Sequence, residues 1–428
     1  MCIPKCVVYA LMWISSVTVS TQKLHKKQLV TLHKWTNLQL SFPTAAELTT
    51  ALKHGYYNRN SPLPVDLDIE YGDDGYHRTF LTIPRLGLGV PYSLAVVADS
   101  DNATVLNPKV IAYPNYDWHS SHGANCSNIT SAIRIFIDEC WRLWVVDSGQ
   151  MNSMQYCPPQ ILAFDLVTDR LVHRYAMPNT LYSPAVSVFT ALAVDVGDAE
   201  PQLECRDTMV YIADPWGYGL IVHDALAMKS WRVEHDLMRP DMNLQKLNAA
   251  NDGIFTVSLS PKRATKGERL LYFHALNSFK EISIALNLVN NASIWSRTSQ
   301  TATDALQVVG SRGTQCESEA MDNAGNLYCS LISSNALISW MQETDYNADT
   351  LQVVAYNPEQ LKFVTGLKVN RNSLEQDELW MLSNDPKLFV GGKVKPGGIK
   401  FQIVGCRTSD LLSNNKCSVG ARSLSANN

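Results

Sequence analysis

The sequence has 428 residues, of which 46% are hydrophobic and 18% charged, and its formal net charge is -4 at pH 7. This charge excludes the strongly basic surface on which nucleic-acid binding depends, so we expect no nucleic-acid partner. No stretch has the length and hydrophobicity of a stable membrane-spanning helix, so we expect no membrane partner either.

The first residues have the pattern of a secretory signal peptide. Lys5 supplies a positive charge, residues 7–19 form an apolar stretch, and Thr18 and Ser20 are small residues of the kind found at cleavage sites. We therefore predict that residues 1–20 are a signal peptide and that the protein is secreted into the extracellular space.

Cysteines and glycosylation triplets agree with secretion. Eight cysteines follow the predicted signal peptide: Cys126, Cys140, Cys157, Cys205, Cys316, Cys329, Cys406 and Cys417. An even number in a secreted chain favours disulfide bonds, although the sequence does not choose among the many pairings. Four N-x-S/T triplets are candidate glycosylation sites: Asn102, Asn125, Asn128 and Asn291.

The first predicted elements follow in chain order. Residues 38–42 alternate apolar and polar side chains as a strand does, and residues 45–53 predict a short helical turn. Acidic residues at positions 66–74 resemble half of a calcium loop, but the required glycine and terminal glutamate are missing. We interpret this segment as a solvated acidic loop. Residues 78–84 and 92–98 predict further strands.

A repeat organises the rest of the chain. It is most complete at residues 138–149, where a turn is followed by bulky and β-branched residues and then by Asp-Ser-Gly. Looser copies carry an aromatic residue at the same place. Successive aromatics are separated by 64, 67, 61, 56 and 52 residues: Phe80, Trp144, Tyr211, Tyr272, Tyr328 and Trp380. Each interval holds about four short strands, as in a propeller blade, whereas a solenoid repeat is usually shorter.

We therefore predict an all-β fold, a six-bladed β-propeller with four-stranded antiparallel blades. No low-complexity linker or block of charge divides the chain. The predicted organisation is a lead-in at residues 21–37, a single propeller domain at residues 38–417 and a flexible tail at residues 418–428. Cys140 and Cys157 bound the best copy of the repeat and are candidate disulfide partners.

Two aspartates close apolar strands of this repeat, Asp147 in Val-Val-Asp-Ser-Gly and Asp214 in Ile-Ala-Asp-Pro-Trp. In a propeller, such carboxylates can lie at the mouth of the central channel and bind a cation or a protonated amine. The alternative is that each carboxylate caps its own turn.

Other candidate sites are weaker. His119, His122 and Cys126 are metal-ligand types, but they lie in a Ser/Gly/Asn-rich loop beside two glycosylation triplets, which favours an ordinary loop. Gly87 and Gly89 lack the third glycine of a dinucleotide fingerprint, and no G-x-S-x-G hydrolase motif is present. We predict no metal and no cofactor.

Several segments, in order, resemble the insect yellow/major royal jelly protein family. They are Cys-Trp-Arg-Leu-Trp-Val-Val-Asp-Ser-Gly at residues 140–149, Cys-Pro-Pro-Gln at 157–160, and the segments 218–222, 253–261, 271–276 and 379–384. The matches run from about residue 38 to residue 417. The resemblance implies a secreted, often glycosylated, six-bladed β-propeller. Members of the family act in melanin pigmentation and cuticle, convert dopachrome, bind biogenic amines in saliva or serve as food.

The resemblance also implies ligand-binding residues. The salivary amine binders use a threonine, an asparagine and a nearby aromatic residue, which correspond here to Thr365, Asn384 and Phe389. Pro386 stands where the aromatic residue is expected, so Phe389 is the nearest candidate. A protonated catecholamine needs an aromatic face, an acid for its charge, and hydroxyl or amide groups for its phenolic oxygens. Thr365 and Asn384 suit the oxygens, and Asp147 or Asp214 suits the charge.

Two classes of function follow. The first is a protein that binds a small amine or catechol derivative at the channel mouth and acts in melanin pigmentation or cuticle maturation. The alternative is a dopachrome-converting enzyme, a tautomerase or decarboxylase, which would need an acid or base beside its substrate. The sequence identifies no such catalytic residue. A storage or structural protein is a further alternative, and the sequence does not determine the oligomeric state.

Overall fold

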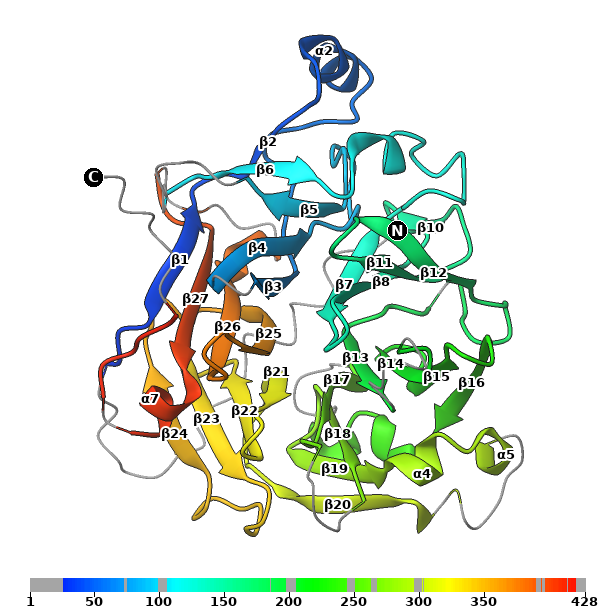
Figure 1. Ribbon diagram of the computed structural model, residues 1–428. Helices are drawn as coiled ribbons and strands as arrows, with labels where there is room; N and C mark the ends of the chain where they lie inside the picture. Colours follow the sequence, from blue (N-terminus) through cyan, green and yellow to red (C-terminus); the bar gives the residue numbers. More distant parts are fainter. Residues whose placement is uncertain are drawn as a thin grey trace.

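The computed structural model describes residues 26–420, except residues 73–74, 99–105, 185, 198–204, 245–250, 263–267, 296–301, 303, 390–393, 395–396 and 414. Six small antiparallel sheets follow one another around a central axis, as the colours of Figure 1 show. The structure confirms the all-β, six-bladed β-propeller. The predicted signal peptide and Asn102 lie outside the described residues.

Each blade is a sheet whose first strand lies beside the axis. Blade 1 contains β3 (Asp66–Gly72), β4 (Gly75–Thr82), β5 (Leu94–Val97), β6 (Lys109–Ala112) and, at its edge, the short β2 (Gln39–Leu40). Blade 2 contains β7 (Ala132–Ile137), β8 (Arg142–Asp147), β11 (Gln160–Asp165) and β12 (Arg170–Ala176). Blade 3 contains β13 (Ala191–Val196), β14 (Thr208–Asp214), β15 (Gly219–Asp224) and β16 (Lys229–Glu234).

The other three blades have the same plan. Blade 4 contains β17 (Ile254–Leu259), β18 (Leu270–Ala275), β19 (Lys280–Ala285) and β20 (Leu306–Ser311). Blade 5 contains β21 (Cys316–Met321), β22 (Asn326–Leu331), β23 (Ala336–Met341) and β24 (Gln352–Tyr356). Blade 6 contains β25 (Val364–Arg371), β26 (Asp377–Asn384), β27 (Phe401–Arg407) and, from the start of the described chain, β1 (Val30–Trp35). The inner strands β3, β7, β13, β17, β21 and β25 contact one another in a closed ring.

The repeated aromatic residues lie on the second strand of each blade, one strand out from the axis. All six are buried, with at most 2% of their surface exposed: Phe80, Trp144, Tyr211, Tyr272, Tyr328 and Trp380. Trp144, for example, belongs to a hydrophobic cluster that joins blade 2 to blade 3. The regular spacing of these aromatic residues in the sequence therefore reflects one large buried aromatic side chain in each blade.

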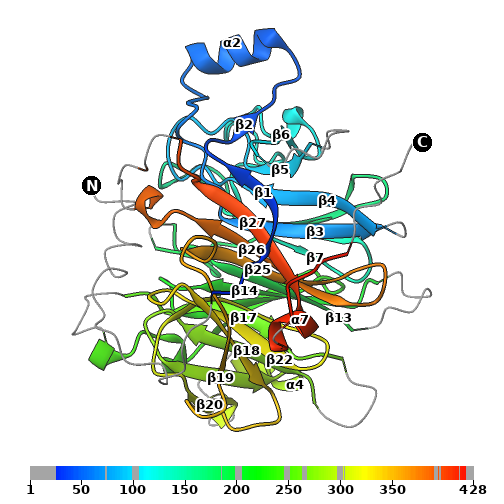
Figure 2. The same ribbon diagram turned by 90° about the vertical axis from the view of Figure 1, so that its left-hand side faces the viewer.

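The two ends of the propeller domain share blade 6. β1 pairs antiparallel with β27, from Val30 opposite Gly405 to Trp35 opposite Phe401, and Figure 2 shows the two strands side by side. The lead-in predicted from the sequence contains these residues, because the strand that pairs with them lies near the other end of the chain. The first tail residue, Ser418, is also bound to the domain, since its N–H donates to the Asp410 carboxylate at 3.0 Å.

The prediction of a solvated acidic loop at residues 66–74 is wrong over its described part. Asp66, Asp68 and Glu70 are buried on the inner strand β3, each at most 5% exposed. Leu67 and Ile69 alternate with them and are also buried, which is the period-two pattern of a strand. The carboxylates tolerate burial because cations and hydrogen-bond donors from neighbouring strands satisfy them.

Four disulfide bonds join the eight cysteines, as the even number predicted. They are Cys126–Cys157, Cys140–Cys205, Cys316–Cys329 and Cys406–Cys417. Cys140 and Cys157 therefore each pair with another cysteine, not with one another. The Cys140–Cys205 bond links blade 2 to blade 3, and the Cys316–Cys329 bond links the inner and second strands of blade 5.

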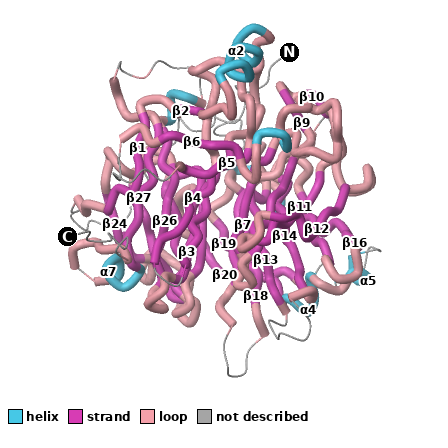
Figure 3. Tube along the Cα trace, turned by 45° about the horizontal axis from the view of Figure 1, so that its top comes forward, coloured by secondary structure: helices cyan, strands magenta, loops and turns pink. Residues whose placement is uncertain are grey.

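In the part of the chain that the structure describes, helices are few and short, and they lie outside the sheets (Figure 3). They are α2 (Ala45–Lys53), α4 (Leu286–Val289), α5 (Ala292–Trp295), α7 (Thr408–Leu412), and the 3-10 turns η2 (Tyr116–Trp118), η3 (Asp236–Met238) and η4 (Pro386–Leu388). β9 (Gln150–Met151) and β10 (Met154–Gln155) form a small hairpin. Helix α2 confirms the predicted helical turn, and Thr44 caps it by accepting from the Glu47 N–H. Among the described residues, no helix is long and apolar enough to cross a membrane.

The closing strand β1 generates a stability prediction. The Trp35 side chain is fully buried and its Nε1 donates to the Pro108 carbonyl oxygen at 2.9 Å. Trp35→Ala removes this contact and leaves a cavity, so we expect it to lower the free energy of unfolding by about 3–5 kcal/mol in urea titrations. Val167→Ala, at a residue that is 79% exposed, is the control and should change it by less than about 0.5 kcal/mol. Equal stability of the two variants would show that β1 does not hold the ring closed.

Candidate functional site

The candidate site is the central channel between the inner strands. Its cavity has a volume of about 560 Å³. The lining residues include the second residue of β25, Thr365, and the last residues of β13 and β21, Val196 and Met321, so the cavity follows the axis. A volume of this order is typical of small-molecule sites.

Irregular pairing at the start of the inner strands shapes one end of this channel. In blades 2, 4, 5 and 6, the register with the second strand shifts within the first few residues. In blade 6 the shift leaves Thr365 without an opposite residue, and in blade 5 it places Glu317 and Ser318 opposite one residue. Such bulges turn side chains out of the regular alternation. They bring Thr365 and Glu317 to the channel wall.

The structure brings Thr365 and Asn384 together. Asn384 Nδ2 donates to Thr365 Oγ1 at 2.9 Å and to the Pro64 carbonyl oxygen at 3.0 Å. Thr365 lines the channel, and Asn384 supports it from the end of β26. Both are buried, and Asn384 Oδ1 has no hydrogen-bond partner among the described residues. Phe389 is outside the channel lining and packs edge-on against Phe363, with ring centroids 5.0 Å apart.

Asp147 and Asp214 lie away from the channel lining. Asp147 is fully buried and accepts from the N–H groups of Thr130 and Ser131 at 2.8 and 2.6 Å. Asp214 is also fully buried and accepts from the Ser187 hydroxyl at 2.7 Å and from Arg232 at 3.0 Å. Both carboxylates hold the segment that leads into the inner strand of their blade. Each also accepts a backbone N–H of its own turn, as the capping alternative expects: Asp147 from Gly149 and Asp214 from Gly217, both at 3.1 Å.

Cations and carboxylates from different blades meet on the channel wall. Asp66 Oδ1 lies 3.8 Å from Arg134 Nη1, and Asp66 Oδ2 lies 3.2 Å from Lys368 Nζ. Arg134 also donates to the carbonyl oxygens of Val65 and Thr365, at 3.0 and 2.7 Å. These contacts tie blades 1, 2 and 6 together. They also place two positive charges on the channel wall.

Asp68 is the next carboxylate along β3. It accepts from Asn370 Nδ2 at 2.7 Å and from the Ile137 N–H at 2.8 Å. Burial raises the pKa of Asp68 to about 6, because the charged form loses hydration, and the nearby Lys368 opposes the rise. With a pKa of about 6, Asp68 is mostly ionised at neutral pH, which is the form that a general base needs.

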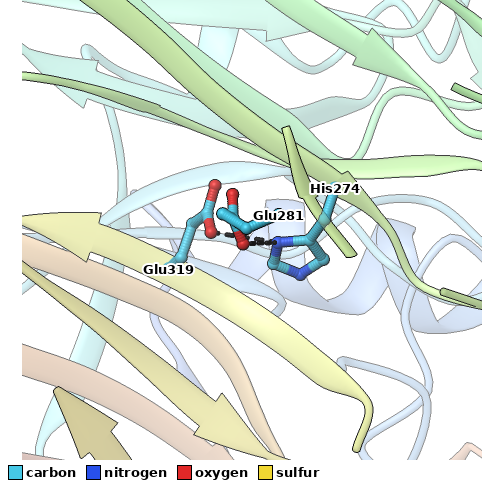
Figure 4. A group of neighbouring side chains, drawn as sticks. All are labelled: His274, Glu281 and Glu319. Atoms are coloured by element: carbon cyan, nitrogen blue, oxygen red, sulfur yellow. Dashed lines mark hydrogen bonds and ion pairs between the residues drawn. The ribbon is translucent and has the colours of Figure 1, made fainter. Parts of the chain in front are cut away.

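A second polar cluster lies in the wall between blades 4 and 5. His274 Nε2 is 3.1 Å from the Cys316 carbonyl oxygen, which can only accept, so this nitrogen carries a proton. His274 Nδ1 is 3.0 Å from a carboxylate oxygen of Glu281 and 3.0 Å from one of Glu319 (Figure 4). Arg312 Nη1 lies 3.1 Å from the same oxygen of Glu281. All four side chains are buried.

The cluster is the one group of metal-ligand types that the described residues bring together, with ligand atoms within 4.8 Å of one another. A lone pair on His274 Nδ1 would repel the two carboxylates, so a cation must lie between them. A proton suffices, because an imidazolium and Arg312 balance the charges of Glu281 and Glu319. A divalent ion would lie beside the Arg312 guanidinium and be repelled by it. We therefore assign the cluster to a protonated histidine.

Sequence reasoning missed most of these groups. It placed Asp66 and Asp68 in a loop, and it did not select Arg134, Lys368 or Glu317. The alternation of residues 66–70 could have revealed β3 as a strand. No local pattern marks the others, because their roles depend on strands from different blades.

Comparisons with known proteins give one consistent result. The sequence model described as Major royal jelly protein matches residues 130–417. Dopaminechrome tautomerase of Drosophila melanogaster is 27% identical over 419 residues, covering 94% of this chain and 87% of the relative. Protein yellow of Drosophila melanogaster is 30% identical over 419 residues, covering 94% and 73%. Among solved structures, a streptogramin B lyase aligns with a TM-score of 0.42 at 10% identity over 76% of this chain and 78% of the lyase, which carries no functional argument.

The His274 cluster predicts how stability depends on pH. Burial and Arg312 lower the pKa of His274, but the two carboxylates outweigh them and raise it from 6.5 to about 9. The folded state thus holds this proton more tightly than the unfolded chain, so its contribution is complete below pH 6.5 and is lost as the pH rises through about 9. Urea titrations should show the free energy of unfolding falling over this range.

His274→Gln provides the comparison. This variant should be less stable than the wild type at the acidic end of the range, and the difference should shrink as the pH rises. A difference that is constant across the range would contradict the protonated histidine.

Proposed function

This chain belongs to the major royal jelly protein family, and we propose that its central channel binds a small amine or catechol derivative and that it acts in melanin pigmentation or cuticle maturation. The relatives named protein yellow and dopaminechrome tautomerase support a role in pigmentation and a catechol-derived ligand. The observation that carries the proposal is the channel itself, a cavity of about 560 Å³ whose wall holds Thr365, Glu317 and Lys368.

The channel wall offers each group that a catechol derivative needs. Phe136 lines it and supplies an aromatic face, with Lys368 Nζ 5.9 Å from the ring centroid. The Thr365 hydroxyl, oriented by Asn384, is suited to a phenolic oxygen. Asn384 Oδ1 and Glu317 Oε2 are buried without a partner among the described residues. Each buried polar atom without a partner lowers the free energy of unfolding by about 1–3 kcal/mol, because it has lost its hydrogen bonds to water. A polar ligand that reaches these atoms would restore a hydrogen bond.

Secretion and glycosylation belong to the proposal. The four disulfide bonds suit an oxidising compartment. Asn125 and Asn291 are exposed and could carry a glycan, whereas the Asn128 amide donates to the Asp117 carbonyl oxygen at 2.9 Å. Mass spectrometry of protein secreted from insect cells, before and after deglycosylation, would identify the modified asparagines.

Calorimetric titration with dopamine tests ligand binding in the channel. We expect saturable binding to the wild type, weakened about 5-fold in Thr365→Val, because the ligand loses a hydrogen bond worth about 1 kcal/mol. Thr168→Val, at an exposed threonine outside the channel lining, should bind as the wild type does. Wild-type protein that binds neither dopamine, serotonin nor catechol would refute the proposal.

A second candidate function, tautomerisation of an aminochrome, is favoured by Asp68 and Lys368. Converting an indoline quinone to a dihydroxyindole moves one proton from each of the two ring CH2 groups to the two quinone oxygens, with no net loss of atoms or electrons. Asp68 on the channel wall would accept a ring proton, and Lys368 would stabilise the negative charge on the oxygens. The name of the relative dopaminechrome tautomerase agrees with this chemistry.

The absorbance decay of dopaminechrome tests this candidate. We expect the wild type to accelerate the decay and Asp68→Asn to lose roughly 100-fold of the acceleration, because the amide cannot accept the proton. The wild-type rate should fall as the pH drops below about 6, where Asp68 becomes protonated. Asp349→Asn, an exposed control, should retain the rate. Saturable ligand binding without acceleration of the decay would support the binding function and would contradict the tautomerase function.

A further inference from the structure

Glu317 is a buried carboxyl group on the channel wall. The residue is 4% exposed, and its Oε2 accepts no hydrogen bond from the described residues. It lies on the inner strand β21, in the irregular segment that faces the channel. Most buried carboxyl groups are paired or hydrogen-bonded, so an unpaired one in a cavity indicates a missing ligand.

The cations of the channel wall are engaged elsewhere. Arg134 is the charged group that acts most directly on Glu317, but it also faces Asp66, at 3.8 Å. Lys368 Nζ lies 3.2 Å from Asp66 and acts on Asp68. Three carboxyl groups therefore share two cations on this part of the wall. The next carboxyl group on β21, Glu319, is matched separately by His274.

We propose that Glu317 is the anion that receives the ammonium group of an amine ligand in the channel. This inference rests on the proposed function and deepens it, because it selects amines that carry an aromatic ring. The ring would lie along the channel toward Phe136, which also lines the cavity. The ammonium would supply the third cation, and it would give the Glu317 carboxylate the donor that it lacks.

The proposal has a measurable consequence for protons. Burial raises the pKa of Glu317 well above its usual range, because the charged form loses hydration, and Arg134 only partly opposes this, so the empty channel favours the protonated carboxyl group. An ammonium bound beside it favours the ionised form. Each amine that binds should therefore release close to one proton from Glu317 to the solvent. Catechol, which has the same ring and no ammonium, should release none.

Calorimetry at pH 7 in two buffers with different ionisation enthalpies counts these protons. We expect close to one proton released per dopamine with the wild type and none per catechol. Glu317→Gln should release no proton with dopamine and should bind dopamine roughly 10- to 100-fold more weakly, while its affinity for catechol is unchanged. The unchanged catechol affinity also shows that the variant is folded. Glu343→Gln, the same substitution at an exposed glutamate, should behave as the wild type.

The two levels of the proposal fail in different ways. If dopamine and catechol both bind but dopamine releases no proton, Glu317 is not the ammonium anchor, although the channel remains a ligand site. If neither ligand binds to the wild type, the proposed function fails and this inference fails with it. The proton count on the wild type decides the matter even if Glu317→Gln does not fold.

Discussion

The closed ring of inner strands depends on the pairing of β1 with β27. Blade 6 takes three strands from the end of the domain and one from its beginning, so its sheet is complete only when the two ends of the domain meet. Trp35 anchors this pairing in a hydrophobic cluster that also contains Trp380, the aromatic residue of blade 6. With the ring closed, the six inner strands have fixed positions around the axis. The channel wall can then bring together side chains that are far apart in the sequence.

Burial of charge on that wall is the second constraint on the structure. Asp66, Arg134 and Lys368 come from three blades and satisfy one another, and His274 lies between carboxylates from blades 4 and 5. Breaking such a network would leave an uncompensated buried charge, which costs several kcal/mol. The networks therefore hold neighbouring blades in register. Glu281 and Glu319 have cationic partners in these networks, whereas Glu317 forms no ion pair with the described residues and its Oε2 accepts no hydrogen bond from them. Buried groups of this kind concentrate at functional sites.

The fold could be predicted from the sequence because the blades repeat. One large aromatic ring per blade gives a regular signal, and counting these rings gave six blades. The same repeat explains why the candidate aspartates misled: Asp147, Asp214 and Asn384 all end the second strand of their blade. Each of them binds the segment entering an inner strand, and only in blade 6 does the partner, Thr365, line the channel.

The rest of the site could not be predicted, because it depends on contacts between blades. In the sequence, the acidic residues of β3 have the pattern of a solvated loop. The cations that neutralise them lie on β7 and β25, which are far away in the sequence. Glu317 reaches the channel because the pairing of β21 with β22 is irregular, and no sequence pattern predicts this irregularity. The resemblance to relatives selected Thr365 and Asn384 as ligand-binding residues, and the structure joins these two side chains by a hydrogen bond. The resemblance did not indicate the charged groups across the channel.

The most direct test of the account is a crystal structure of the protein with dopamine bound. The account predicts density for one dopamine in the central channel, with its ammonium nitrogen within hydrogen-bond distance of Glu317 and a catechol oxygen near Thr365. Dopamine bound outside the channel, or in the channel with its ammonium turned away from Glu317, would contradict the account.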